Sequence, residues 1–166
     1  SGKLAAGYVR GIQSVGVSAC PKHFAANNQE LRRMASNSVL DERTLRELYL
    51  TGFEIAVKEG RPKCIMTSYN RVNGTYANEN HHLLQDILHG EWGYDGAVVT
   101  DWGGSNDHVE GVREGSTLEM PCPGFGSAKR LMQAVEEGRL PESAVDARVD
   151  ELLELVFTTD AAVKAA

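Results

Sequence analysis

The chain has 166 residues, of which 42% are hydrophobic and 24% charged, and its formal net charge at pH 7 is −6. These values are typical of a single α/β domain, and an acidic chain without a basic stripe is not expected to bind nucleic acid. No apolar run is long enough to cross a membrane, and the first ten residues lack the features of a signal peptide. A membrane partner is therefore not expected, and the cellular location is left open.

Apolar residues recur along the chain at the spacings of helices and of short buried strands. In chain order this pattern predicts a helix at 3–14, a strand at 15–20, a helix at 41–60, a strand at 64–67, a helix at 80–90, a strand at 97–100, a helix at 106–114, a strand at 118–120, and helices at 127–137 and 141–157. The tail 158–166 is small and polar enough to fray.

Residues at the ends of these segments support the assignment. Asp41 and Asn80 are good N-cap residues, and Gly60 and Pro62 are expected to end the helix that Asp41 begins. The polar stretch 27–38 is too long for a tight turn. A loop of that length in a compact domain is usually functional.

The alternation of helices and strands predicts a parallel sheet joined by right-handed crossovers. Four such units are about half of an eight-stranded barrel, which usually needs roughly 200 residues or more. We therefore predict an α/β fold, a partial TIM-type barrel with about four parallel strands. A half barrel exposes two edge strands and an open apolar face, so we also expect it to self-associate or to belong to a larger assembly.

The residues that most often bind metals form no convincing group. Cys20, Cys64 and Cys122 are odd in number and form no Cys-x-x-Cys pair, so neither a disulfide framework nor a zinc site is expected. At least two of them are predicted to be buried small apolar residues. His81 and His82 lack a partner at metal spacing and are predicted to be solvated. No metal or cofactor is expected.

Polar or aromatic side chains follow or lie within each predicted strand. They are Lys22 and His23, Tyr69, Asp101 and Trp102, and Glu119. Catalytic groups gather at the C-terminal ends of parallel strands, so these side chains are expected to share one rim. A polar bowl beside aromatic rings is the type of surface that binds a sugar.

Each of these residues also has a simpler interpretation. Asp101 could cap the next helix, since Asp is a common cap residue. Lys22 and His23 could be solvated loop residues, and Tyr69 could equally belong to the core. Trp102 could be plain packing, and Glu119 could pair with a basic side chain. The combination favours a site more strongly than any single residue.

At this point the sequence resembles glycoside hydrolase family 3, and most closely its β-glucosidases. The blocks that carry the resemblance are residues 22–30, 42–47, 66–74 and 96–103. Residues 118–121, Leu-Glu-Met-Pro, match the closing barrel strand of the family. The match runs from about residue 5 to about residue 157. It implies that residues 1–157 are the C-terminal half of the catalytic barrel domain.

The resemblance also implies roles for individual residues. Asp101 matches the nucleophile, which is the Asp of a Ser/Thr-Asp-Trp motif. The substrate-binding residues it implies are Lys22, His23, Arg33, Met66, Tyr69 and Trp102, with Arg32 as the alternative register for Arg33. The loop 25–30 lacks the His-Asp pair of the N-acetylglucosaminidase branch, which argues against that branch.

A retaining glycosidase needs an ionised carboxylate and a second carboxyl group about 5–5.5 Å away as acid/base. A nearby lysine should favour the ionised form of Asp101, and Tyr69 could orient it by donating a hydrogen bond. The resemblance implies that the acid/base Glu lies in a domain that follows the barrel. Glu79, Glu110 and Glu119 do not sit in settings that would replace it.

We therefore predict a fragment of a retaining enzyme that cleaves small β-glucosides or oligosaccharides by double displacement. The alternative is a non-catalytic half barrel that only binds carbohydrate or is a structural fragment. A third interpretation, a nucleotide-binding α/β domain, lacks a glycine-rich phosphate loop after a strand. The sugar itself is left open, since xylose and arabinose are also possible within the family.

Overall fold

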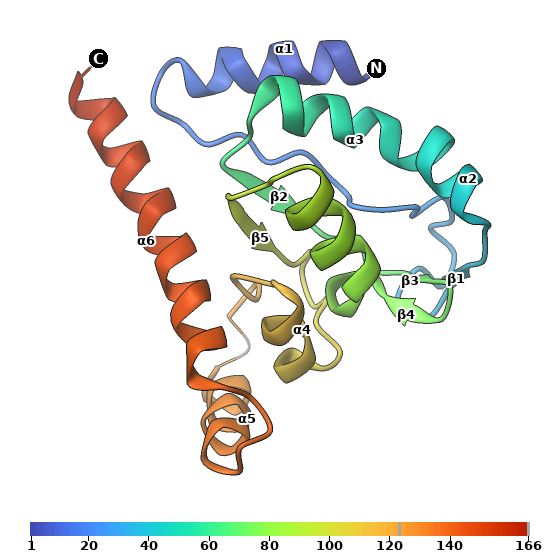
Figure 1. Ribbon diagram of the computed structural model, residues 1–166, viewed down its shortest axis with the longest axis vertical. Helices are drawn as coiled ribbons and strands as arrows, with labels where there is room; N and C mark the ends of the chain where they lie inside the picture. Colours follow the sequence, from blue (N-terminus) through green and yellow to red (C-terminus); the bar gives the residue numbers. More distant parts are fainter. Residues whose placement is uncertain (123, 166) are drawn as a thin grey trace.

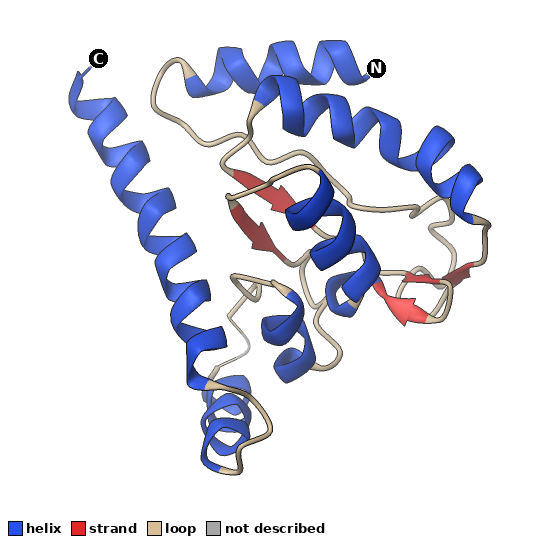
Figure 2. Ribbon diagram, in the orientation of Figure 1, coloured by secondary structure: helices blue, strands red, loops and turns tan. Residues whose placement is uncertain are grey.

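The computed structural model describes residues 1–122 and 124–165, and it is a mixed α/β structure with short strands among long helices (Figure 2). The α-helices are α1 (Gly2–Gln13), α2 (Glu42–Thr44), α3 (Thr51–Ile55), α4 (His108–Glu114), α5 (Phe125–Glu136) and α6 (Glu142–Ala165). Wider π-helical turns occupy Leu45–Leu50, Ala56–Gly60 and His82–Glu91, and a short 3-10 helix spans Ala77–Glu79. The strands are β1 (Asn37–Ser38), β2 (Cys64–Met66), β3 (Arg71–Val72), β4 (Thr75–Tyr76) and β5 (Ala97–Val99).

The centre of the fold is the parallel pair β2 and β5, in which Cys64 lies opposite Ala97 (Figure 1). All six residues of the pair are buried, as expected for a parallel sheet covered on both faces. A single parallel bridge flanks the pair on each side, Phe24 with Thr67 and Val99 with Leu118. Four segments therefore run in parallel, but only two of them are strands, which corrects the prediction of four.

The predicted strand at 15–20 is wrong. Residues 14–16 form a turn, and Gly16 has a positive φ of 81°. Pairing with β2 begins only at Pro21, whose carbonyl accepts a hydrogen bond from Met66 N at 3.1 Å. A proline lacks an N–H but keeps its carbonyl. Pro21 therefore begins the paired segment instead of ending it.

The predicted strand at 118–120 is reduced to the single bridge at Leu118. β5 ends at Val99, and Pro121 follows closely. β5 and the segment 118–120 therefore share little more than one bridge. The helix ends predicted for Asp41 and Asn80 are confirmed, because each side chain accepts a hydrogen bond from a backbone N–H three residues later.

A second small sheet has the order β1-β3-β4. β1 pairs in parallel with β3, and β3 pairs antiparallel with β4. The connection from β3 to β4 is the turn Asn73-Gly74, where both residues have positive φ, as a two-residue hairpin of this type requires. This sheet fixes the end of the long loop 27–36 beside the hairpin (Figure 1).

Helix α1 lies beside α3 and the π-helical turn Ala56–Gly60 (Figure 1), but its large apolar residues at helical spacing, Leu4, Tyr8 and Ile12, lie on its exposed face. Ala6 and Val9 are buried, whereas Leu4 and Tyr8 are each 74% exposed. A Cβ added at Gly60 would lie 3.0 Å from Val9 Cβ and 3.1 Å from Ala6 Cα. Small residues therefore permit a close helix contact, and the large apolar stripe of α1 is left on the surface.

The main core lies between the β2–β5 pair and the helices on one side of it. Its largest fully buried members include Phe24, Leu45, Ile65, Leu84 and Ile87. The opposite side carries a smaller cluster of Cys64, Met66 and Val99, with Cys20, Leu118 and Met120 packed against it. Phe24, which directly follows His23 in sequence, thus belongs to the main core.

Helix α6 extends beyond Phe157 to Ala165, further than the sequence predicts. Lys164 pairs with Asp160 four residues earlier, and the hydroxyls of Thr158 and Thr159 bond to carbonyls of the preceding turn. These local bonds extend the helix into the segment expected to fray, whose last residue, Ala166, lies outside the described residues.

Two further expectations concern the whole chain. Cys64 is buried, Cys20 is half-buried and Cys122 is exposed, so the prediction that at least two of the three are buried is wrong. In residues 1–122 and 124–165, no helix has both the length and the apolar character that crossing a membrane requires.

Candidate functional site

Asp101 lies two residues beyond the end of β5, and its side chain is 14% exposed. Its Oδ1 accepts a hydrogen bond from the backbone N–H of Trp102 at 2.8 Å. Its main-chain carbonyl accepts another from Gly104 N, also at 2.8 Å. The N-cap of α4 is Asp107, not Asp101. Asp101 is therefore not the cap of the next helix, and its Oδ2 remains available to other groups.

His23 comes from a distant part of the chain to meet this carboxylate. Its Nε2 lies 3.1 Å from Asp101 Oδ2. The position of His23 follows from the pairing of the next residue, because Phe24 N donates to Met66 O at 2.8 Å and Phe24 O accepts from Ser68 N at 2.8 Å. The imidazole of His23 therefore lies against one carboxylate oxygen of Asp101.

Tyr69 also lies near Asp101 and is only 6% exposed. Its hydroxyl donates to the carbonyl of Trp102 at 2.9 Å. Burial raises the pKa of Tyr69, and the hydrogen bonding and negative charge of Asp101 raise it further. Tyr69 therefore stays protonated beside the carboxylate, and its best-placed acceptor is the Trp102 carbonyl.

The loop 27–36 contributes Arg33. Its guanidinium carbon lies 4.5 Å from the centroid of the Tyr69 ring, and its Nη1 pairs with Glu30 Oε2 at 2.8 Å. Of the two adjacent arginines, Arg33 is the one that stacks on Tyr69. Glu30 lies within the matching block 22–30 but was not among the predicted site residues, although it precedes Arg33 by three positions.

Trp102 and Met66 differ in exposure. Trp102 is 51% exposed, so its ring is free to form a wall for a ligand beside Asp101. Met66 is buried in the cluster with Cys64 and Val99, on the same face of the sheet as Leu118 and Met120. Met66 therefore borders the face from which Asp101 emerges.

Lys22 is the predicted residue that the structure does not join to the others. It is exposed, and it lines a separate cavity of about 370 Å³ together with Leu48 and Phe53. Within residues 1–122 and 124–165, no hydrogen bond or ion pair links it to Asp101. The role expected for Lys22 therefore has no direct geometric support.

The three other carboxylates considered as an acid/base have partners elsewhere. Glu79 Oε1 accepts from Asn106 N and Asp107 N at 2.9 and 2.6 Å. Glu110 pairs with Arg113. Glu119 Oε2 lies 3.4 Å from His108 Nδ1, on a side chain only 13% exposed. Glu79 and Glu110 therefore have structural roles where they lie, whereas Glu119 Oε2 is buried without a hydrogen-bond partner among the described residues.

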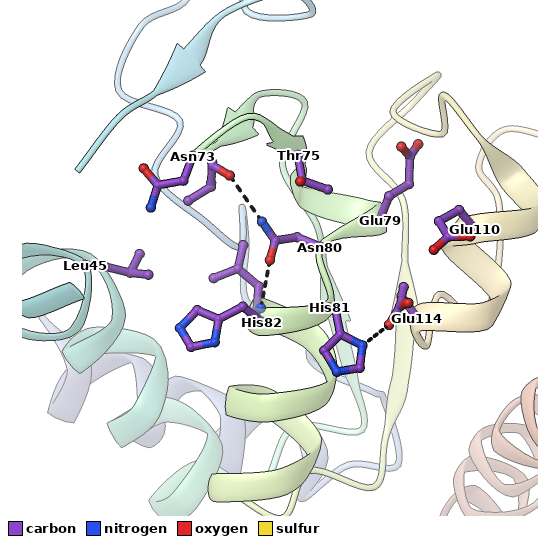
Figure 3. A pocket seen from close by; sticks show the side chains of 11 residues that line it. Leu45, Asn73, Thr75, Glu79, Asn80, His81, His82, Glu110 and Glu114 are labelled. Atoms are coloured by element: carbon purple, nitrogen blue, oxygen red, sulfur yellow. Dashed lines mark hydrogen bonds and ion pairs between the residues drawn. The ribbon is translucent and has the colours of Figure 1, made fainter. Parts of the chain in front are cut away.

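A cavity of about 420 Å³ lies away from Asp101, around the start of the helix His82–Glu91 (Figure 3). In Figure 3 the imidazole of His81 points to Glu114, and His81 Nδ1 lies 2.6 Å from Glu114 Oε2. His82 pairs with Asp86 at 2.9 Å. Both histidines therefore contact carboxylates as well as solvent. Within the described part of the chain, no three His, Cys, Asp or Glu side chains form a group that could hold a metal ion.

The residues that converge are thus Asp101, His23, Tyr69, Arg33 and Trp102. They supply one carboxylate that accepts a backbone hydrogen bond and lies beside an imidazole, a neutral phenol, a stacked cation and an exposed indole. Such a set can bind the hydroxyls of a sugar, stack on its apolar face and direct a carboxylate at it.

The known proteins that this chain resembles are glycoside hydrolases. The family model described as Glycosyl hydrolase family 3 N terminal domain matches residues 1–155. The chain is 48% identical over 157 residues to thermostable beta-glucosidase B from Acetivibrio thermocellus, covering 95% of this chain and 21% of that protein. It is 46% identical over 157 residues to beta-glucosidase B from Emericella nidulans, covering 94% and 19%.

Among solved structures, the fold is similar to beta-glucosidase 3B from Thermotoga neapolitana in complex with glucose. The TM-score is 0.94 at 39% sequence identity, over 98% of this chain and 24% of that chain. The chain thus spans about a fifth of the length of the curated relatives it matches.

Proposed function

Because the chain belongs to glycosyl hydrolase family 3, we propose that it carries the nucleophile of a retaining β-glucosidase, and that this nucleophile is Asp101. The observation that carries the proposal is the position of the Asp101 carboxylate. It lies just beyond β5, with Oδ2 3.1 Å from His23 Nε2 and Oδ1 2.8 Å from Trp102 N. These contacts aim one carboxylate and leave the indole of Trp102 exposed beside it.

In the proposed reaction, a carboxylate oxygen of Asp101 forms a bond to the anomeric carbon while the bond from that carbon to the leaving oxygen breaks. The leaving oxygen takes a proton from an acid. Water then attacks the same carbon and gives a proton to the conjugate base of that acid, and the ester bond to Asp101 breaks. The Trp102 N–H orients one carboxylate oxygen through both steps, and the His23 imidazole lies beside the other.

The proposed subsite for the cleaved sugar is formed by His23, Arg33, Tyr69 and Trp102, with Met66 at its border. Arg33, His23 and the Tyr69 hydroxyl can bind sugar hydroxyls, and Trp102 can stack on the ring. Lys22 joins this set by resemblance alone. The proposed substrates are small β-glucosides or oligosaccharides, and the proposed architecture is the C-terminal half of a TIM-type barrel, residues 1–157.

The acid/base is proposed to lie outside residues 1–166. The carboxylates of Glu79 and Glu110 are engaged with Asn106 and Arg113, and Glu119 lies beside His108. This observation also favours a second candidate for the chain taken alone, which is carbohydrate binding without cleavage. Hydrolysis of an aryl β-glucoside by the isolated chain, tested with and without azide as an external nucleophile, separates the two.

The main test is the substitution Asp101→Asn in a longer protein that contains this chain. We expect cleavage of an aryl β-glucoside to be abolished while the circular dichroism spectrum is unchanged. Asp107→Asn is a matched control, because Asn also caps helices well and Asp107 is the cap of α4. Near-normal turnover by Asp101→Asn would refute the nucleophile assignment.

A further inference from the structure

Thr100 separates β5 from Asp101, and it is completely buried. Its hydroxyl forms two hydrogen bonds with one residue of the neighbouring segment. Thr100 Oγ1 accepts from Met120 N at 2.8 Å and donates to Met120 O at 3.2 Å. The Thr100 side chain therefore links the two backbone segments where regular strand pairing stops. This position is next to the single bridge between Val99 and Leu118.

The same carbonyl of Met120 also fixes the other end of the Asp101-Trp102 turn. Gly103 N donates to Met120 O at 2.9 Å, and Thr100 N donates to Leu118 O at 3.1 Å. The residues before and after Asp101-Trp102 are thus tied to one position of the neighbouring segment. The direction of the Asp101 carboxylate depends on this attachment, since only two residues lie between its ends.

We propose that Thr100 is a positioning residue for the attack of Asp101 on the anomeric carbon, an inference that rests on the proposed function. Without the hydroxyl, Met120 N loses its acceptor and one end of the turn is released. A misplacement of about 1 Å at a reacting group can lower the rate about 100-fold. The loss is expected in the bond-forming step and not in the binding of the sugar.

The test compares Thr100→Val, which keeps the shape and removes the hydroxyl, with Thr100→Ser, which keeps the hydroxyl. Both are made in a longer protein that contains this chain. The readout is the rate constant of covalent inactivation by a 2-deoxy-2-fluoro-β-glucoside with an activated leaving group, because this step reports nucleophilic attack alone. We expect Thr100→Val to lower this rate constant about 10- to 100-fold. The inactivator concentration that gives half of the maximal rate should change little. Thr100→Ser should stay within about threefold of the parent.

Thr117→Val is the matched control for a purely structural effect. Thr117 Oγ1 accepts from Val98 N at 2.9 Å and donates to Glu151 at 2.6 Å, so it ties the same strand away from Asp101. It should lower the melting temperature without slowing inactivation of the folded protein. Equal slowing by Thr117→Val and Thr100→Val, or inactivation of Thr100→Val within twofold of the parent, would overturn the proposal.

Two outcomes keep the inference separate from the proposed function. If Thr100→Val does not fold, a loss of more than tenfold in Thr100→Ser would overturn the inference, because that variant retains the hydroxyl. Mass spectrometry of the labelled protein tests the nucleophile itself. A label on a residue other than Asp101 refutes the proposed function, and with it the role of Thr100, whatever the rates are.

Discussion

Phe24 links the core to the candidate site, because it is fully buried and directly follows His23. Its ring meets Phe53 edge-on, with centroids 5.2 Å apart and an interplanar angle of 76°. It meets Trp92 at 5.9 Å and 64°. The substitution Phe24→Ala removes both contacts and leaves a cavity between the sheet and the helices.

The cost follows from these contacts. Truncation of a buried Phe to Ala typically costs about 3–5 kcal/mol of unfolding free energy. Each well-oriented aromatic pair adds about 0.5–1.5 kcal/mol beyond area burial, so a value of about 4 kcal/mol is expected here. With a urea m-value of about 2 kcal/mol/M, the unfolding midpoint should fall by about 2 M.

The assay is urea unfolding of the 166-residue chain, followed by far-UV circular dichroism so that the signal does not depend on Trp92. Phe125→Ala is the matched control, since Phe125 is 85% exposed and its truncation should cost less than about 0.5 kcal/mol. Phe24→Leu keeps most of the volume and should fold even if Phe24→Ala does not. A loss at Phe24→Ala no larger than at Phe125→Ala would refute the reasoning.

Three further outcomes are expected. Asn80→Ala removes the acceptor for Leu83 N at 3.0 Å and should lower the unfolding free energy by about 1–2 kcal/mol in the same urea assay; an unchanged midpoint would contradict the cap. The hydrogen bond to Asp86 raises the pKa of His82 above 6.5, so its stabilisation is complete below that pH and lost as pH rises through the folded-state value. The difference in melting temperature from His82→Ala should therefore shrink between about pH 6 and pH 8.5, and a constant difference would argue against the pairing. The exposed apolar stripe of α1 predicts concentration-dependent self-association in sedimentation velocity, and a monodisperse monomer that binds no hydrophobic dye would exclude it.

The sequence predicted best what depends on short-range chemistry. The apolar runs of β2 and β5 have few alternatives to a buried strand, and the side chains of Asp41 and Asn80 satisfy helix N–H groups only a few residues away. The motif around Asp101 also predicted its place just after a buried strand. These features require no knowledge of which segments meet.

What the sequence could not predict depends on distant partners. The face of α1 that is buried is set by its contact with Gly60, about fifty residues away, and not by its own apolar stripe. The segment before Phe24 pairs only where β2 offers a partner, so the strand pattern at 15–20 was misleading. Lys22 adjoins His23 in sequence, yet His23 contacts Asp101 whereas Lys22 lines a separate cavity.

The small sheet β1-β3-β4 has a consequence for protein engineering. β1 ends the loop that carries Arg33, and β3 follows directly after Tyr69 and Asn70. Asn70 is fully buried, and its amide donates to the carbonyls of Ala25 and Ala26 at 3.2 and 3.3 Å. Loop exchange between relatives should therefore treat residues 25–38 and 69–76 as a single cassette. Replacing one segment alone would disturb the hydrogen bonds from Asn70 to the carbonyls of the other segment. These bonds lie close to the contact between Arg33 and Tyr69.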